Sequence, residues 1–205
     1  MTRRRTVDVR RAEILRATVQ EIERRGFAGT RVADVAQALQ VSAALIFYHF
    51  DSKDDLLSAA FAHAAEHDLS RLSDAAAADA PAAERLRRIL RLYAPVGSSP
   101  GGTLWIDSWS AALREPRLRA VSRRLDVRWK DAVAAVITDG VAAGELTCSD
   151  PQGAAWRITA LLDGLAVQVT VHRGVLSRRR MHDWVSAAAA AELGLDPAAL
   201  GWAGS

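Results

Sequence analysis

The 205-residue sequence predicts an all-α protein. Apolar residues recur at helical spacing, as at Val32, Val35 and Ala36, which share one face of a helix. Capping residues and prolines stand between such runs, and Asp150 followed by Pro151 is typical of a helix start. No stretch alternates convincingly between apolar and polar residues, which is the pattern of a half-buried strand. The chain is therefore expected to form helices joined by short breaks.

The region from Thr30 to Leu57 has the spacing of a helix-turn-helix followed by a third helix. The predicted order is a helix over 32–39 capped by Thr30, a turn at 40–41, a helix over 43–49 capped by Ser42, and a helix from 53 capped by Ser52. Ile46 and Phe50 are expected to face inward, which leaves the other side chains of the second helix at its surface or edge. This is the arrangement of a DNA-reading helix pair, so gene regulation is the leading hypothesis.

Upstream of this region, residues 9–25 predict one further helix. Leu15 and Ile22 stand at i and i+7 on its apolar face, and Gly26 is suited to end the helix. Three arginines at positions 3–5 precede the helix. We expect them either to form a flexible arm that reaches into a DNA minor groove or to lie in a solvated, disordered tail.

After Ser52 the sequence predicts a larger helical domain. The expected helices cover residues 53–77, 81–93, 103–113, 116–144, 151–172 and 177–194, and the clearest loop covers 95–102. We therefore divide the chain into residues 1–52, a helix-turn-helix DNA-binding domain, and residues 53–205, a helical effector-binding and dimerisation domain.

The composition is that of an ordinary soluble globular protein, with half of the residues apolar and a quarter charged. The net charge is +3, but residues 2–50 carry nine basic and five acidic residues, a local charge of +4. This end of the chain therefore suits attachment to DNA phosphates. The sequence shows no membrane-spanning run and no signal peptide, and its single cysteine, Cys148, excludes an intramolecular disulfide. We expect a cytoplasmic protein.

The chain resembles the TetR family of transcriptional regulators, with a BetI-like carboxy-terminal domain. The amino-terminal resemblance covers roughly residues 8–60 and rests on Arg25-Gly26-Phe27, Thr30, Val35-Ala36, Val41-Ser42, Phe47, His49-Phe50, Ser52-Lys53 and Leu56-Leu57. The looser carboxy-terminal resemblance rests on Trp109, Ala112-Leu113, Pro116, Leu118-Arg119, Trp129, Gly140, Gly144-Glu145, Asp150-Pro151 and residues 160–165. The sequence departs from the family pattern at three places: Arg31 stands where a second Ser or Thr is frequent, and Phe47 stands where Tyr is common. Ala44-Leu45 stands where the family usually has a small residue followed by Thr or Ala.

The residues expected to contact DNA lie on and beside the second short helix. They are Arg31, Ser42, Ala43, Ala44, Leu45, Phe47, Tyr48, His49 and Lys53. Arg31 and Lys53 can reach phosphates, and the small or apolar residues allow close approach to thymine methyl groups. Tyr48 and His49 each carry a polar tip for a phosphate or a base edge. The alternative is that one of these two packs inside the small domain.

The last two long helices predict association of two chains. The helix from Pro151 is apolar almost all round and the final helix carries an alanine run, so both must be covered on several sides. We expect a two-fold interface formed by Trp156, Leu161, Leu165, Val169, Met181, Trp184 and Ala188, with a purely intrachain core as the alternative. A dimer also suits DNA, because two half-sites about 34 Å apart are usually read together.

By resemblance, the larger domain holds a cavity for a small-molecule effector. The residues placed near it are Phe61, Tyr93, Trp105, Trp109, Trp129, Asp163 and Gln168. Aromatic walls with one or two acidic groups suit a cationic or flat aromatic ligand. The alternative is that the tryptophans simply fill the core.

The sequence thus predicts a ligand-responsive transcriptional regulator, a dimeric repressor that binds a palindromic operator and is released by a small-molecule effector. We expect no enzyme activity, no cofactor and no metal. One rival is a DNA-binding regulator without small-molecule control. A remote rival is a zinc-dependent helical hydrolase, because His63, Glu66 and His67 form an H-x-x-E-H motif, although no third zinc ligand is evident in the sequence.

Overall fold

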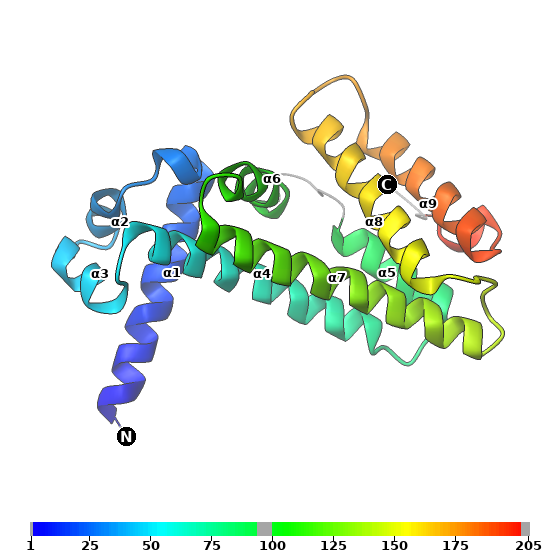
Figure 1. The fold of residues 1–205 in the computed structure, drawn as a ribbon, viewed down its shortest axis with the longest axis horizontal. Coiled ribbons are helices and arrows are strands. Elements are labelled where there is room, and N and C mark those ends of the chain that lie inside the picture. The colour runs from blue at the N-terminus through cyan, green and yellow to red at the C-terminus, as the bar shows by residue number, and fades with distance from the viewer. Residues whose placement is uncertain (1, 94–99, 202–205) are drawn as a thin grey trace. The chain divides into compact units, whose positions relative to one another are not determined.

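The computed structural model describes the backbone of residues 2–93 and 100–201 and the side chains of residues 8–92 and 103–201 (Figure 1). Within these ranges the chain is helical and contains no strand, so the predicted all-α fold is confirmed. In chain order the elements are α1 (Thr2–Gly29), α2 (Val32–Ala38), α3 (Ala43–His49), α4 (Lys53–Ala76), α5 (Ala82–Tyr93), α6 (Pro100–Ala112), α7 (Pro116–Ala142), α8 (Pro151–Thr170), α9 (Arg178–Leu193) and the 3-10 helix η1 (Pro197–Ala199).

The helices group into two compact units. The first contains the residues up to His67 together with Thr103–Leu125, so it holds α1 to α3, the start of α4, most of α6 and the start of α7. The second contains residues 68–102 and 126 onward, with the rest of α4 and α7 and with α5, α8 and α9. The boundary predicted at residue 52 does not coincide with a boundary between these two units, and the division by function stays a prediction.

The first unit is held together by the apolar faces that the sequence predicts. α1 buries Ile14 and Ile22, α2 buries Val35, α3 buries Ile46 and α4 buries Phe61, each with at most 2% of its surface exposed. Burying such a side chain contributes roughly 1.5–3 kcal/mol to folding. These contacts therefore fix the position of α3 on the first unit.

α1 begins earlier than predicted. It starts at Thr2 rather than Val9, so the arginines at positions 3–5 continue the helix instead of forming a flexible arm or tail. Their side chains lie outside the described residues. Arginine has a high helix propensity, but this polar segment has no apolar stripe from which the sequence pattern could show a helix.

The connection from α1 to α2 is built around a break at Gly26. Its φ of 73° and ψ of 167° are not helical, as expected of the glycine stop, but helical residues resume as far as Gly29. The prediction that Thr30 caps α2 is wrong: its hydroxyl donates to the Gly26 carbonyl oxygen at 2.8 Å. Arg31 occupies the N-cap position instead, and its backbone N–H donates to the Asp34 carboxylate at 3.1 Å.

In the second unit, α8 and α9 pack against each other (Figure 1). The buried residues of the two helices include Ala154, Ile158, Leu162, Met181, Val185, Ala189 and Leu193. The predicted starts of these helices are confirmed, because Asp150 accepts from the Gly153 N–H at 2.9 Å and Ser177 accepts from the Arg180 N–H at 3.2 Å. α8 ends at Thr170, two residues before the predicted end. Gly194 ends α9 with a positive φ of 67°. No described helix is long and apolar enough to cross a lipid bilayer.

Polar contacts position α5 in the second unit. The Ala82 backbone N–H at its start donates to the Glu145 carboxylate. Arg85, one turn further on, donates from Nε to the Ala76 carbonyl oxygen at 2.6 Å and pairs with Asp139 at 2.9 Å. The three contacts join α5 to the end of α4, to α7 and to the segment after α7.

Candidate nucleic-acid interface

α3 is a short helix with one buried side and one exposed side. Its N-cap is Ser42, whose Oγ accepts from the Leu45 N–H at 3.3 Å, as the sequence predicts. Ile46 is fully buried, whereas Phe47 and Tyr48 expose 51% and 71% of their surfaces. The core contact fixes the helix and leaves its other side open to solvent.

All nine residues predicted to contact DNA lie in the first unit. Arg31, Ser42, Ala43, Ala44, Phe47 and Tyr48 are exposed, and Leu45, His49 and Lys53 are half-buried. The exposure of Tyr48 removes the alternative that this side chain packs inside the small domain. Its ring contacts the His49 ring edge-on, with the centroids 5.2 Å apart. Contact of these residues with DNA stays a prediction.

Arg11 is a positioning residue that the sequence analysis missed. Its Nη1 donates to the His49 carbonyl oxygen at 2.6 Å, and its guanidinium lies 4.2 Å from the centroid of the Phe50 ring. The guanidinium therefore links α1 to the carboxy-terminal end of α3 by a charge-assisted hydrogen bond and a cation–π contact. Its spacing in the sequence could have indicated this role, because Arg11 precedes the buried Ile14 and Leu15 by one helical turn and so lies on the same face of α1.

The basic residues that flank α3 differ in their surroundings. Arg31, before α2, is exposed, while the carboxylate of Asp34 is shared between the Arg31 backbone N–H and Arg25, whose Nη2 is 3.5 Å away. Lys53, at the first residue of α4, makes a long contact of 3.5 Å from Nζ to the Ala28 carbonyl oxygen. Both cations therefore lie at helix starts, where free backbone N–H groups also favour a phosphate.

The start of α4 is capped by Ser52, as predicted, and Asp55 adds two further contacts. The Asp55 N–H donates to Ser52 Oγ at 3.0 Å, as predicted. The Asp55 carboxylate reaches back to the N–H of Asp51 at 3.3 Å rather than to that of Ser52. It also pairs with Arg117 of α7 at 3.4 Å. α7 thus contacts the helix that follows the candidate DNA-reading element.

Asp107 of α6 is a second residue that the sequence analysis missed. Its Oδ2 accepts from the Phe27 backbone N–H at 2.8 Å, beside the break at Gly26. A break in a helix leaves such N–H groups without a helical acceptor, and the carboxylate supplies one. No local pattern predicts the pairing, since the two residues are 80 positions apart.

Three of the residues predicted for effector binding belong to an aromatic cluster in the first unit. The Phe61 and Trp105 rings meet edge-on at 5.0 Å, and the Trp105 and Trp109 rings lie 6.4 Å apart. Phe27 extends the cluster at 6.1 Å from Phe61. The remaining predicted residues, Trp129, Asp163 and Gln168, belong to the second unit, and the side chain of Tyr93 lies outside the described residues. Effector contact stays a prediction for all seven.

The predicted dimer residues form an incomplete surface on α8 and α9. Trp156 and Trp184 expose 47% and 51% of their surfaces, which is unusual for tryptophan. Leu161, Leu165, Val169 and Ala188 are half-buried. The prediction for Met181 is wrong: this residue is fully buried within the chain, so its side chain offers no surface to a second chain.

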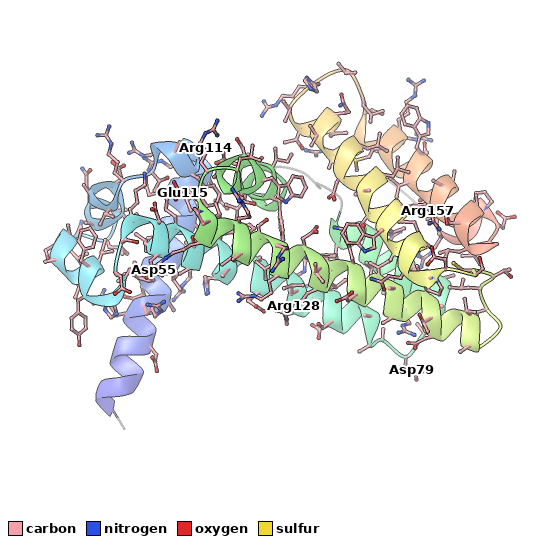
Figure 2. All side chains as sticks on the ribbon, in the orientation of Figure 1. Asp55, Asp79, Arg114, Glu115, Arg128 and Arg157 are labelled. Atoms are coloured by element: carbon pink, nitrogen blue, oxygen red, sulfur yellow. The ribbon has the colours of Figure 1, made fainter. Side chains whose placement is uncertain are left out.

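A charged pair borders a groove on this surface. Arg157 of α8 (labelled in Figure 2) donates from Nε and Nη2 to the carboxylate of Glu192 on α9, at 2.7 and 2.8 Å. These hydrogen bonds lower the pKa of the Glu192 carboxyl group. The same groove is also lined by the apolar residues Ile158, Leu161, Ala188 and Ala191. An apolar floor with a polar rim is the composition of a protein–protein interface.

The described structure gives the zinc motif no third ligand. His63 and His67 are exposed on α4. Within the described residues, no group of three or more His, Cys, Asp or Glu side chains is placed to hold a metal ion. The rival hypothesis of a zinc hydrolase is therefore without structural support there.

Comparison with known proteins relates both parts of the chain to one family. Residues 14–60 match the family model of the bacterial regulatory proteins of the tetR family, and residues 81–194 match that of the BetI-type transcriptional repressor carboxy-terminal domain. The HTH-type transcriptional regulator BetI of Burkholderia mallei is 33% identical over 168 residues, covering 77% of this chain and 80% of that protein. BetI of Paraburkholderia phymatum is 32% identical over 174 residues and 83% of each chain.

Solved structures of regulators have the same fold. A transcriptional regulator from Saccharomonospora viridis in complex with choline superposes with a TM-score of 0.82 at 28% identity, over 91% of this chain and 98% of that one. A TetR-family regulator from Rhodococcus sp. gives a TM-score of 0.74 at 30% identity, over 89% and 95%. Together with the exposed, capped α3, these similarities show that the chain belongs to the TetR family of transcriptional regulators, with a BetI-type carboxy-terminal domain.

Proposed function

We propose that this chain is a dimeric repressor whose two α3 helices enter successive major grooves of a palindromic operator. The observation that carries the proposal is the exposure of Phe47 and Tyr48 on a helix whose opposite side is fixed by the buried Ile46. A DNA-reading helix needs both properties, because it must hold its orientation while its outer side chains reach base edges.

The proposed contacts divide into phosphate and base contacts. Arg31 and Lys53 hold phosphates on either side of the groove, which positions α3 without reading sequence. Ala43 and Ala44 allow close approach to thymine methyl groups, and the Tyr48 hydroxyl donates to a phosphate or a base edge. Arg11 acts through the His49 carbonyl oxygen and holds the end of α3 in place.

The proposed dimer forms through the α8–α9 surface. Trp156 and Trp184 would be its apolar anchors, with Leu161, Leu165, Val169 and Ala188 completing it. Two-fold symmetry at this surface would present two α3 helices to half-sites about 34 Å apart. Because its target is DNA, we place the activity in the cytoplasm.

We further propose that the effector is a small organic cation. The support is the similarity to the Saccharomonospora viridis regulator in complex with choline, and the aromatic cluster that includes Trp105 and Trp109. Aromatic faces attract quaternary ammonium groups. The effector favours an arrangement of the protein with lower operator affinity, and about 1–3 kcal/mol of coupling between the two ligands is typical.

Selection of bound duplexes from a random DNA pool, followed by fluorescence anisotropy, tests the DNA proposal. We expect a palindromic consensus. Tyr48→Phe should weaken binding to it by about 1 kcal/mol through loss of one hydrogen bond. Lys53→Gln should weaken binding to all DNA sequences alike. It should also reduce the slope of log affinity against log salt concentration by about 0.9. Arg124→Gln, which removes an exposed charge from α7, is the control. Enrichment of no sequence would refute the proposal.

Titration of choline chloride into the operator complex tests the effector proposal. We expect the operator Kd to rise by about 5–150-fold, with sodium chloride as the control for ionic strength. An unchanged Kd excludes choline as the effector. If other small cations also leave it unchanged, regulation without small-molecule control becomes the better account.

A further inference from the structure

The first unit contains a cavity of about 180 Å³ beside the candidate DNA-binding surface. Its walls come from the end of α1, the start of α4, the second half of α6 and the start of α7. Figure 2 labels Arg114 and Glu115 of this lining at the junction of α6 and α7. Phe27, Leu57 and Leu118 supply an apolar floor, and all three are buried.

Several polar groups of the lining are not engaged by other side chains; of these, Asp54 and Arg114 are exposed to solvent, and Lys53 and Glu115 are half-buried. Ser58 is 6% exposed, yet its hydroxyl makes no hydrogen bond within the described residues. The side chains of Asp54, Arg114 and Glu115 likewise make no hydrogen bond or ion pair there. Lys53 has only the 3.5 Å contact to a backbone carbonyl oxygen. Solvent therefore reaches the Ser58 hydroxyl oxygen, and the cavity offers donors and acceptors that a ligand can use in place of water.

The charges of the lining favour a ligand that carries both signs. Lys53 and Arg114 are cationic, while Asp54, Asp107 and Glu115 are anionic. Asp107 keeps its charge, but its Oδ2 is engaged by the Phe27 N–H, so Asp54 and Glu115 are the carboxylates without such a contact. A simple anion or cation would face groups of its own sign, whereas a zwitterion pairs with both.

The volume limits the size of that ligand. A volume of about 180 Å³ suits a single free amino acid or a molecule of similar size, and it is smaller than the usual drug-sized pocket.

We propose that this cavity binds a small zwitterion of amino-acid size, with its anionic group at Lys53 and Arg114 and its cationic group at Asp54 and Glu115. None of the seven residues predicted for effector binding lines this cavity, although Phe27 of its floor also contacts Phe61 of the aromatic cluster. Lys53 also belongs to the proposed DNA contacts. A bound carboxylate neutralises this ammonium group and weakens its hold on an operator phosphate. This last step rests on the proposed function, whereas binding itself does not.

Isothermal titration calorimetry of the full chain without DNA tests binding. The probes are free L-amino acids, each titrated singly to about 10 mM, with sodium acetate and methylammonium chloride as probes that carry only one of the two charges. We expect at least one amino acid to bind with a Kd below about 1 mM and the single-charge probes to bind at least about tenfold more weakly. Absence of binding by every amino acid overturns the proposal, as does equal binding of acetate or methylammonium.

Variants locate the site. Arg114→Gln and Glu115→Gln should each weaken binding of the amino acid about tenfold or more. The control is Arg123→Gln, which changes an exposed arginine of α7 outside the lining and should leave binding unchanged. Ser110→Phe, which fills the cavity from its exposed edge, is a second test that removes no charge. Unchanged affinity in all three lining variants places the ligand elsewhere and refutes the assignment.

Anisotropy with the selected operator tests the coupling. The amino acid that binds should raise the operator Kd of the wild-type chain and leave that of Arg114→Gln unchanged. Calorimetric binding with no change in operator affinity overturns the coupling through Lys53. Failure to bind any DNA would refute the proposed function and leave the calorimetric result intact.

Discussion

At the scale of single residues, Arg11 is the contact that ties the candidate recognition helix to α1. We expect Arg11→Gln to reduce the free energy of unfolding by about 1–2 kcal/mol, because a charge-assisted hydrogen bond and a cation–π contact are both lost. Operator affinity should fall as well, since the end of α3 is less firmly held. Denaturant unfolding and anisotropy measure the two effects.

Arg16→Gln is the matched control for Arg11, because it removes the same charge from an exposed position on the same helix. Equal losses of affinity in the two variants would show that Arg11 contributes only charge. A loss confined to Arg11→Gln supports its role in positioning α3.

His182 predicts a pH dependence of stability. Burial lowers its pKa below the ordinary value of 6.5, and the positive charges of Arg178 and Arg91 act in the same direction, while Asp183 opposes them. A histidine with a lowered folded-state pKa contributes stability that is present above 6.5 and is lost as the pH falls toward the folded-state value. We expect His182→Gln to flatten the decline in unfolding free energy between about pH 7 and pH 5.

Urea unfolding at several pH values measures this effect. The control is His172→Gln, which changes an exposed histidine after α8. A decline as steep in His182→Gln as in the wild type would assign the pH dependence to other groups.

At the scale of elements, the break in α1 sets the direction of the chain into α2. Gly26 has a positive φ of 73°, and a Cβ there would lie 3.1 Å from Asp107 Oδ2. We expect Gly26→Ala to lower the free energy of unfolding by about 1–3 kcal/mol, through backbone strain and disturbance of the Asp107 hydrogen bond. Thermal and chemical unfolding measure the loss.

Gly29→Ala provides the matched control three residues away. Its backbone is not in the left-handed region, and the nearest atom to an added Cβ is 3.4 Å away. Alanine at such a position should be neutral or stabilising by about 0.4–1 kcal/mol. If Gly26→Ala behaves like Gly29→Ala, the break does not require glycine.

The helix-turn-helix was the most predictable element of the chain. Ser42 and the alternation of buried Ile46 with exposed neighbours are local signals, and α3 has the predicted bounds. The cap of α2 was not predicted correctly, because a Thr hydroxyl can bind a backbone carbonyl oxygen before it as well as a helix N–H after it. The break at Gly26 turns it toward a carbonyl oxygen instead of the helix start.

At the scale of the whole molecule, the exposed tryptophans of α8 and α9 predict the oligomeric state. We expect Trp184→Glu to convert a dimer into a monomer with unchanged helix content, because a charge replaces an apolar anchor at the proposed interface. Sedimentation velocity and circular dichroism check both parts. Operator binding should weaken by more than tenfold, about 1.4 kcal/mol, because the two α3 helices of the dimer are no longer linked.

Leu113→Glu is the control for this variant, since Leu113 is 72% exposed but lies in the first unit. It should leave the dimer intact. A dimer that persists in Trp184→Glu would place the interface on another surface.

The sequence by itself determined the helical class, the order of the helices, the helix-turn-helix and the family, because these depend on residue spacing, caps and breaks along the chain. The tertiary structure decided which side chains are exposed and which distant residues are in contact. It buried Met181, exposed Tyr48, and brought Arg11 to His49 and Asp107 to Phe27. Such pairings depend on where distant helices meet in space, and neither periodicity nor capping carries that information.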